Sequence, residues 1–239
     1  MKKLLLLLLW ILNTIPLLFA QKTINDLNAE KRNVNAFHGI EVSTGISLIL
    51  TEGISEEVAV SASTTDFRDK IVTKVENGIL KIYYENKAAS INTKKVNKDL
   101  KAYVSYKNID KLEVTTGAQV EIEGILKAAS LKILANTGAQ IKGEIKTEDL
   151  KIDQHTGSKI TLNGETIRLD VAGETGSKFQ GIDLKTSNCN VKVSTGAIST
   201  VTAEKELYIK ASTGGNVKYK GETPVREIKK NTGGTVTRI

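Results

Sequence analysis

The stretch "QHTGSKITLNG" (residues 154–164) recurs, with substitutions, through much of the chain. Related stretches are "ANTGAQIKG" (135–143), "GETGSKFQG" (173–181), "VSTGAISTV" (193–201) and "ASTGGNVKYKG" (211–221). Each contains a Thr-Gly pair, and the glycines of all such pairs are Gly45, Gly117, Gly138, Gly157, Gly176, Gly196, Gly214 and Gly233. The gaps between them are 72, 21, 19, 19, 20, 18 and 19 residues. All pairs but the first therefore form one continuous array with a period of about 19 residues.

Apolar residues recur at fixed, even distances from each Thr-Gly pair, and even spacing is the period of a β-strand with one buried face. Six and four residues before the Thr lie Leu131 and Ile133, Leu150 and Ile152, Leu169 and Val171, Cys189 and Val191, and Leu207 and Ile209. Four residues after it lie Leu48, Val120, Ile141, Ile160, Phe179, Val217 and Val236. The pattern predicts a short strand on each side of the Thr-Gly pair.

A unit of about 19 residues that holds two or three short strands has no room for a helix. The repeat therefore predicts an all-β protein, a parallel β-helix (β-solenoid) in which each repeat forms one rung and like residues stack on like. An antiparallel sandwich would also show alternation, but it would not keep one side-chain register through so many near-equal units.

The Thr-Gly pair is interpreted as a bend in the rung. Glycine adopts the positive φ that a corner requires. The β-branched Thr is expected in extended backbone, with hydroxyl hydrogen bonds passing along the column. Because the Thr shares the even parity of the buried positions, a structural role is favoured, and a ladder of ligand-binding hydroxyls is the alternative.

Residues 53–110 interrupt the period. Within them "EEVAVSA" (56–62), "DKIVTKVENGILKIYYENK" (69–87) and "LKAYVSY" (100–106) read as strands. Asn77-Gly78, flanked by alternating apolar residues, predicts a two-residue hairpin turn. We expect the hairpin strands to cover an end or flank of the solenoid that would otherwise expose unpaired backbone.

The first 20 residues, "MKKLLLLLLWILNTIPLLFA", have the basic start, apolar stretch and small final residue of a secretory signal peptide. A retained membrane anchor is the alternative, but the unbroken apolar run is short for a bilayer span.

We expect residues 21–32 to be an N-terminal linker and residues 33–239 to form a single β-helix domain, with 53–110 as the inserted hairpin region and 111–239 as the regular rungs. The sequence thus predicts an exported protein, in the periplasm, on the outer cell surface or outside the cell, with no membrane span after cleavage.

The net charge limits the classes of binding partner that the sequence suggests. Removing residues 1–20 takes two of the 34 Lys and Arg and none of the 27 Asp and Glu, which leaves a net charge of +5. The chain has a mild excess of positive charge without the dense basic clusters of a nucleic-acid-binding protein, so acidic polysaccharides and lipid headgroups are the acidic partners to consider.

The single cysteine, Cys189, cannot form an internal disulfide and lies in an apolar slot of the repeat, so we expect a buried structural thiol.

Three segments carry a resemblance to a known family: "FHGIEVSTGISLILTEG" (37–53), "VENGILKIYY" (75–84) and "LKAYVSYKNIDKLEVTTGAQVEIEG" (100–124). Together with the Thr-Gly rungs that follow, they resemble the auto-transporter adhesin head GIN domain, a domain of unknown function that is abundant in Bacteroidetes. The resemblance covers about residues 33–237 and implies a secreted or periplasmic right-handed β-helix. It brings no established catalytic or binding residues.

No residue pattern indicates catalysis, a metal or a cofactor. His38 and His155 are the two histidines, and neither belongs to a metal-ligand pattern. An acid–base cluster of His155 with Asp153 and Glu174 is the alternative to a solvated polar column. The outward position three residues before the Thr carries acids at one end and lysines at the other, without the paired carboxylates of a polysaccharide hydrolase. We therefore predict a non-enzyme without cofactors.

Lysines occupy that outward position in three successive repeats: Lys192, Lys210 and Lys229. We expect them to stack into a basic stripe that binds acidic glycan, with a solvated, aggregation-resistant face as the alternative. The predicted function is adhesion or surface binding at the cell envelope, with acidic polysaccharide or a cell-surface protein as partner. Two alternatives stay open, a self-assembling structural protein, including a homodimer formed end to end, and a polysaccharide-active enzyme.

Overall fold

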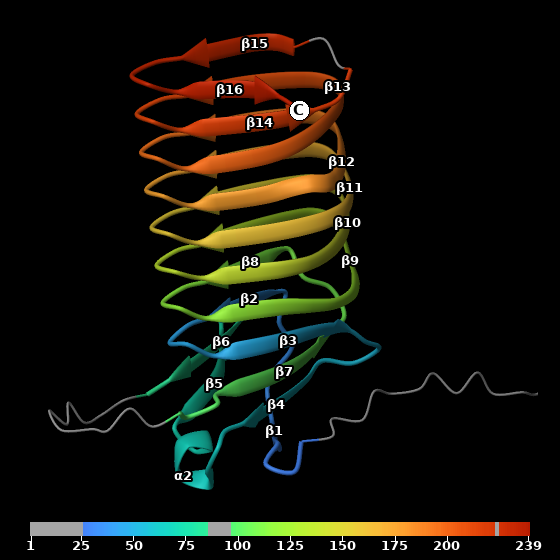
Figure 1. The fold of residues 1–239 in the computed structure, drawn as a ribbon. Helices are drawn as coiled ribbons and strands as arrows, with labels where there is room; N and C mark the ends of the chain where they lie inside the picture. The colour runs from blue at the N-terminus through green and yellow to red at the C-terminus, as the bar shows by residue number, and fades with distance from the viewer. Residues whose placement is uncertain (1–25, 86–96, 223–224) are drawn as a thin grey trace, which may run out of the picture.

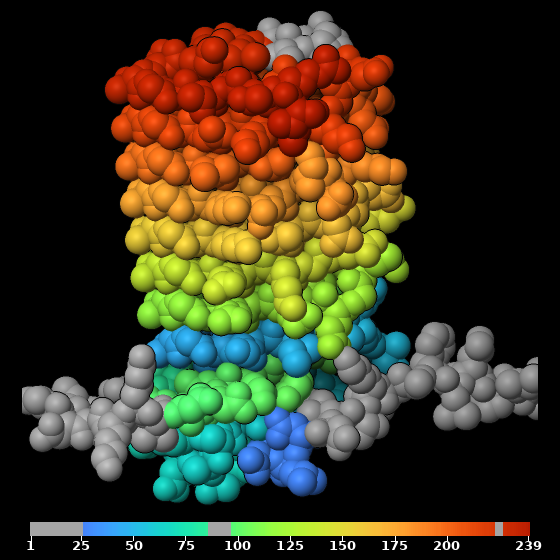
Figure 2. All heavy atoms as spheres, in the orientation of Figure 1, coloured from blue at the N-terminus to red at the C-terminus, as the bar shows by residue number. Residues whose placement is uncertain are grey.

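The computed structural model describes residues 26–85, 97–222 and 225–239, so the predicted signal peptide (1–20) lies outside the described residues. The described chain forms a parallel β-solenoid of about seven turns with rungs about 19 residues apart, which confirms the fold predicted from the repeat (Figure 1). Figure 2 shows the later rungs, from green to red, stacked in chain order above a blue layer, with a further green layer and the N-terminal segments below that blue layer. None of the helices in these ranges is long and apolar enough to cross a membrane.

Long strands that bend midway form the regular rungs, and they are β9 (Gln119–Ala135), β10 (Gln140–Gln154), β11 (Lys159–Gly173), β12 (Lys178–Val193) and β13 (Ile198–Ala211). They pair in parallel in the order β9-β10-β11-β12-β13. Equivalent residues of successive repeats lie opposite each other, as Ile141 does with Ile160. The same ladder continues in β14 (Asn216–Lys220), β15 (Val225–Lys230) and β16 (Thr235–Arg238).

The first rung consists of β2 (Gly39–Val42) and β3 (Ser47–Glu52), and it is enclosed by strands that come later in the chain. On one side, β6 (Ile79–Tyr84) pairs with β2 and β7 (Lys101–Tyr106) pairs with β3, both in parallel. On the other side, β8 (Lys111–Val114) pairs with β2 and β9 pairs with β3. The chain after β3 therefore first builds the base of the solenoid and then returns past the first rung.

The predicted hairpin is present at this base. β5 (Ile71–Glu76) and β6 pair in antiparallel fashion around Asn77 and Gly78, whose φ angles are 52° and 74°. β4 (Glu57–Ser61) pairs in antiparallel fashion with β7, and β1 (Glu30–Arg32) pairs with β4. Residues 30–32, expected to belong to a linker, are thus part of the sheet, because β4 offers them a free edge.

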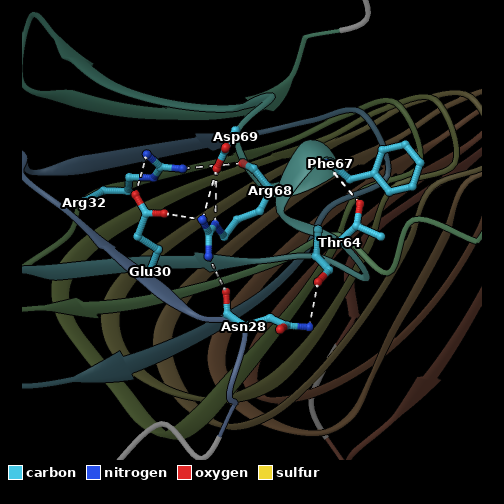
Figure 3. A network of polar contacts seen from close by, with 8 residues as sticks. Asn28, Glu30, Arg32, Thr64, Phe67, Arg68 and Asp69 are labelled. Atoms are coloured by element: carbon cyan, nitrogen blue, oxygen red, sulfur yellow. Dashed lines mark hydrogen bonds and ion pairs between the residues drawn. The ribbon is translucent and has the colours of Figure 1, made fainter.

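A polar network joins β1 to the short helix α2 (Thr65–Arg68) at the base (Figure 3). Glu30 forms ion pairs with Arg32 at 3.0 Å and with Arg68 at 2.7 Å. Arg68 also donates to the Asn28 carbonyl oxygen at 3.3 Å. The helix has four residues, too few to produce a helical apolar period, so the sequence does not predict it.

The core is a column of apolar side chains inside the solenoid. The residues predicted to face inward are buried, and they include Leu131, Ile133, Leu150, Ile152, Leu169, Val171, Val191, Leu207, Ile209, Leu48, Val120, Ile141, Ile160, Phe179 and Val217. Val236 in the last rung is only partly buried. Because burial of one such side chain contributes roughly 1.5–3 kcal/mol, this column supplies most of the driving force for folding.

The Thr-Gly pairs form turns, but the predicted conformation of their threonines is wrong. The threonines have φ angles of 38° to 62° and the glycines of 68° to 75°, so both residues are left-handed, as in a type I′ turn. The turn closes locally, as when the Ala139 N–H donates to the Asn136 carbonyl oxygen at 3.2 Å. Reversing the chain within two residues requires two left-handed residues in a row, which places the Thr side chain in solvent rather than at a buried position.

Backbone groups, rather than Thr hydroxyls, connect the turns of successive rungs. The N–H of each turn glycine donates to the carbonyl oxygen of the next turn's Thr at 2.9 to 3.1 Å, for example from Gly138 to Thr156. A hydroxyl contact between rungs occurs instead at the opposite bend, where Thr147 donates to Thr166 at 2.8 Å in the interior. The hydroxyl column predicted at the Thr-Gly edge is therefore replaced by a ladder of peptide groups.

Cys189 is buried at 1% exposure, as predicted for a structural thiol. Burial away from water raises the pKa of this thiol to about 12. Because the thiolate is the reactive form, we expect native protein at pH 8 to resist a thiol reagent such as dithionitrobenzoate, and protein unfolded in guanidinium to react within minutes with one equivalent. Rapid labelling of the native protein would contradict a closed core at this rung.

Candidate functional site

The solenoid has two broad sheet faces on either side of the Thr-Gly edge. The pre-turn face consists of the strands that lead into the turns, namely β2, β8, residues 130–135, 149–154, 168–173, 188–193 and 206–211, and β15. The post-turn face consists of the strands that follow the turns, such as β3, β14 and β16. On each face alternate side chains point outward, and equivalent outward residues form straight columns along the solenoid axis.

Lys192, Lys210 and Lys229 stack directly on the pre-turn face, as the sequence predicts for a stripe. Lys192 lies opposite Lys210 across β12 and β13, and Lys210 lies opposite Lys229 across β13 and β15. We call these three residues the lysine column. Neighbouring strands are about 4.8 Å apart, so the column presents positive charges at the spacing of the rungs.

The charges of the lysine column are only partly balanced by nearby acids. Lys229 forms an ion pair with Glu227 at 2.7 Å. Within the part of the chain that the structure describes, no acid forms an ion pair with Lys192 or Lys210. Tyr208, which is 40% exposed, lies in the next outward column between Asn190 and Glu227. Two free ammonium groups next to an exposed aromatic ring can hold an anion and pack against an apolar ring face.

Other charged pairs lie lower on the same face. Arg168 forms a bidentate pair with Asp149, and its hydrogen bonds hold the pKa of the Asp149 carboxyl below its usual range. Lys132 lies 3.7 Å from Asp153. Arg168, Asp149 and Lys132 are well exposed, so these pairs contribute little to stability.

The histidines lie apart from the lysine column. His155 is half-exposed beside a turn, with its Nδ1 3.6 Å from Glu174. His38 pairs with Asp110 at 2.9 Å near the base of the solenoid. Within the described ranges, no group of three or more His, Cys, Asp or Glu side chains could hold a metal ion.

A groove that the sequence does not predict runs along the edge opposite the Thr-Gly turns. It has a volume of about 650 Å³. Its lining includes Lys127, Lys146, Lys185, Glu148, Glu204 and Ile167. One outward column at this bend reads Lys127, Lys146, Glu165, Lys185 and Thr202. Its lysines are thus interrupted by a glutamate, and the column ends in a threonine. The sequence signal for the groove is only the bend itself, which a second glycine marks in most repeats, at Gly124, Gly143, Gly164, Gly181 and Gly221.

The sequence places this solenoid in a family. The model of the family described as "Putative auto-transporter adhesin, head GIN domain" matches residues 36–223. The chain therefore belongs to this GIN domain family, as the resemblance of its segments indicated. No curated protein matches the sequence.

Several solved structures share the fold. A putative adhesin from Bacteroides fragilis is 17% identical, covers 90% of this chain and 98% of its own, and superposes with a TM-score of 0.75. A putative adhesin from Parabacteroides merdae is 15% identical, with coverages of 88% and 95% and a TM-score of 0.65. A putative lipid binding protein from Parabacteroides distasonis is 15% identical, with coverages of 90% and 98% and a TM-score of 0.64. At these identities the likeness concerns the fold.

Proposed function

We propose that this protein is an exported, non-enzymatic surface-binding protein of the cell envelope that holds acidic polysaccharide on its lysine column. The family description and the names of two similar structures support an adhesin-like surface protein. The observation that carries the finer proposal is the direct stacking of Lys192, Lys210 and Lys229 on one flat face.

The chemistry of the column favours an extended polyanion over a compact anion. Successive ammonium groups rise with the rungs, about 4.8 Å apart, so a polymer lying along the axis can meet several of them at once. Each contact is weak in water, but several contacts on one chain act together. Tyr208 offers a ring face beside the lysines on which a sugar can pack. We therefore assign carboxylated or sulfated polysaccharide as the ligand class.

The test is retention of the purified chain without residues 1–20 on immobilised acidic and neutral polysaccharides, at low and at high salt. We expect retention on the acidic polymers at low salt and its loss at high salt, because exposed charges are screened. Changing Lys192, Lys210 and Lys229 together to Glu is expected to weaken retention at least tenfold.

The chain offers a matched control on the post-turn face. Lys159 and Lys178 stack directly there, and Lys218 lies in a neighbouring column. Changing these three to Glu alters the net charge by the same amount, and we expect retention to fall far less. Equal losses in the two triple variants would assign binding to bulk charge, and absence of retention in the unmodified protein would contradict the proposal.

A further inference from the structure

A small polar cluster interrupts the apolar interior behind two successive Thr-Gly turns. Its members are Gln154, the last residue of β10, and Ser158 and Ser177, which directly precede β11 and β12. All three are at most 1% exposed, and we call them the interior polar cluster. The equivalent inward positions of the rungs just below and above carry only apolar residues: Ala135, Ala139, Val193 and Ala197. The polar side chains are therefore confined to one level of the solenoid.

The backbone brings the members of the interior polar cluster together. Ser158 and Ser177 occupy the same position of adjacent rungs, since the Lys178 N–H donates to the Ser158 carbonyl oxygen at 2.8 Å. Gln154 lies across the same turn from Ser158 and directly opposite Gly173 in the next rung. Gly173 has no side chain, and a Cβ atom there would lie 3.2 Å from the Ser177 Oγ. The side chain of Gln154 therefore has room to extend towards the rung of Ser177.

Each member of the interior polar cluster has one atom without a hydrogen-bond partner among the described residues. These atoms are Gln154 Oε1, Ser158 Oγ and Ser177 Oγ. The Gln154 Nε2 donates to the Lys178 carbonyl oxygen at 3.2 Å. This contact fixes which way the amide points, because a carbonyl oxygen accepts only from the NH₂ end. Buried atoms of this kind are normally paired with protein or with ordered water, since leaving them unpaired is costly.

We propose that one water molecule is bound inside the solenoid between Gln154, Ser158 and Ser177. The water donates its two hydrogens to Gln154 Oε1 and to one serine Oγ, and it accepts from the hydroxyl of the other serine. About three hydrogen bonds are typical of a buried water. The hydroxyl and amide groups of the cluster are uncharged, so they suit water rather than an ion, whose desolvation they could not offset.

The spacing of the rungs suits a bridging water. Residues at the same position of adjacent rungs are about 4.8 Å apart. A water that bonds to two oxygen atoms at about 2.8 Å each, with a near-tetrahedral angle, spans about 4.6 Å between them. At the opposite bend Thr147 donates directly to Thr166 at 2.8 Å, whereas neither serine hydroxyl of the interior polar cluster makes such a contact with a described residue. The water takes the place of that direct contact.

The direct test is a crystal structure of the chain without residues 1–20, at a resolution that shows ordered water. We expect one peak of electron density within about 2.6–3.2 Å of Gln154 Oε1, Ser158 Oγ and Ser177 Oγ. A cluster without this peak, or serine hydroxyls bonded directly to the Gln154 oxygen, would overturn the proposal.

Thermal unfolding of single variants distinguishes a bound water from hydroxyls that merely lack partners. Ser158→Ala and Ser177→Ala each remove one partner of the water, so we expect each to lower the thermal midpoint by about 2–4 °C. Without the water, each change would delete an unpaired buried hydroxyl and raise the midpoint. Ser199→Ala is the control, because the Ser199 hydroxyl is buried without a described partner but lies at another inward position, opposite Phe179. We expect this control not to lower the midpoint.

A triple variant tests whether the three side chains act through one shared water. Gln154→Met, Ser158→Ala and Ser177→Ala together leave no polar side-chain atom in the interior polar cluster, and methionine keeps the length of glutamine. Replacing all partners by apolar groups of similar shape is nearly neutral, so we expect a midpoint within about 2 °C of the unmodified protein. A loss equal to the sum of the single losses would mean that the side chains act separately, against the proposal. Because the cluster is interior, either outcome leaves polysaccharide retention untouched.

Discussion

Replacing Gly164 by alanine is expected to lower the free energy of unfolding by about 4 kcal/mol. A Cβ atom at this position would lie 2.0 Å from the Ile145 carbonyl oxygen, and the φ angle of Gly164 is +108°, a value that L side chains rarely adopt. Ile145 lies directly opposite Gly164 in the neighbouring rung, so its backbone is held by the ladder and cannot withdraw. The free-energy costs of the steric clash and of the backbone strain therefore add.

Gly157 provides the matched control for this substitution. It also has a positive φ of +68°, but a Cβ atom there would have no neighbour within 4 Å. Gly157→Ala should therefore cost only the left-handed strain, about 1–2 kcal/mol. Urea denaturation followed by circular dichroism measures both variants. Equal losses would show that the rung beside Gly164 yields to the added methyl group.

Asparagine in place of threonine at four of the turns is expected to raise the free energy of unfolding by about 2–4 kcal/mol in total. The four residues are Thr137, Thr156, Thr175 and Thr195, all left-handed and exposed. A β-branched residue is strained in this conformation, whereas asparagine adopts it routinely. Because each turn repeats the same strain, the gains should accumulate over the rungs.

Thr161→Asn provides the control, since Thr161 lies in β11, where β-branched residues are favoured. We expect this variant to gain no stability, and the quadruple variant to unfold at a higher urea concentration than the unmodified protein. A quadruple variant that is less stable would mean that contacts of the Thr methyl or hydroxyl groups outweigh the backbone strain. The turn threonines would then have a structural role of their own.

The parts of the fold that the sequence reveals are those in which side-chain alternation and period coincide. The buried columns, the rung spacing and the hairpin at Asn77 follow from positions that can be counted along the chain. Alternation does not report the backbone dihedrals at a turn, so the left-handed threonines are not predicted. It also does not report which strands pair, so the enclosure of the β2–β3 rung by later strands is visible only in the structure.

The candidate site, like the fold, has one part that the sequence predicts and another part that only the structure shows. The lysine column is predicted because its three residues share one offset from the turn, and the structure stacks them as expected. The groove at the opposite bend is formed by residues of mixed type, whose nearness depends on how sharply each strand curves.

The ladder of peptide groups at the Thr-Gly edge also affects how such a protein can change during evolution. Each turn glycine donates to the next turn in the same way, so one rung presents the same backbone to its neighbours as any other. Duplication or deletion of one whole unit of 19 residues would leave every remaining donor with an acceptor, although interior side chains would meet new neighbours. Genes for this architecture can therefore gain or lose length in steps of one repeat, and the solenoid can become longer or shorter without a new fold.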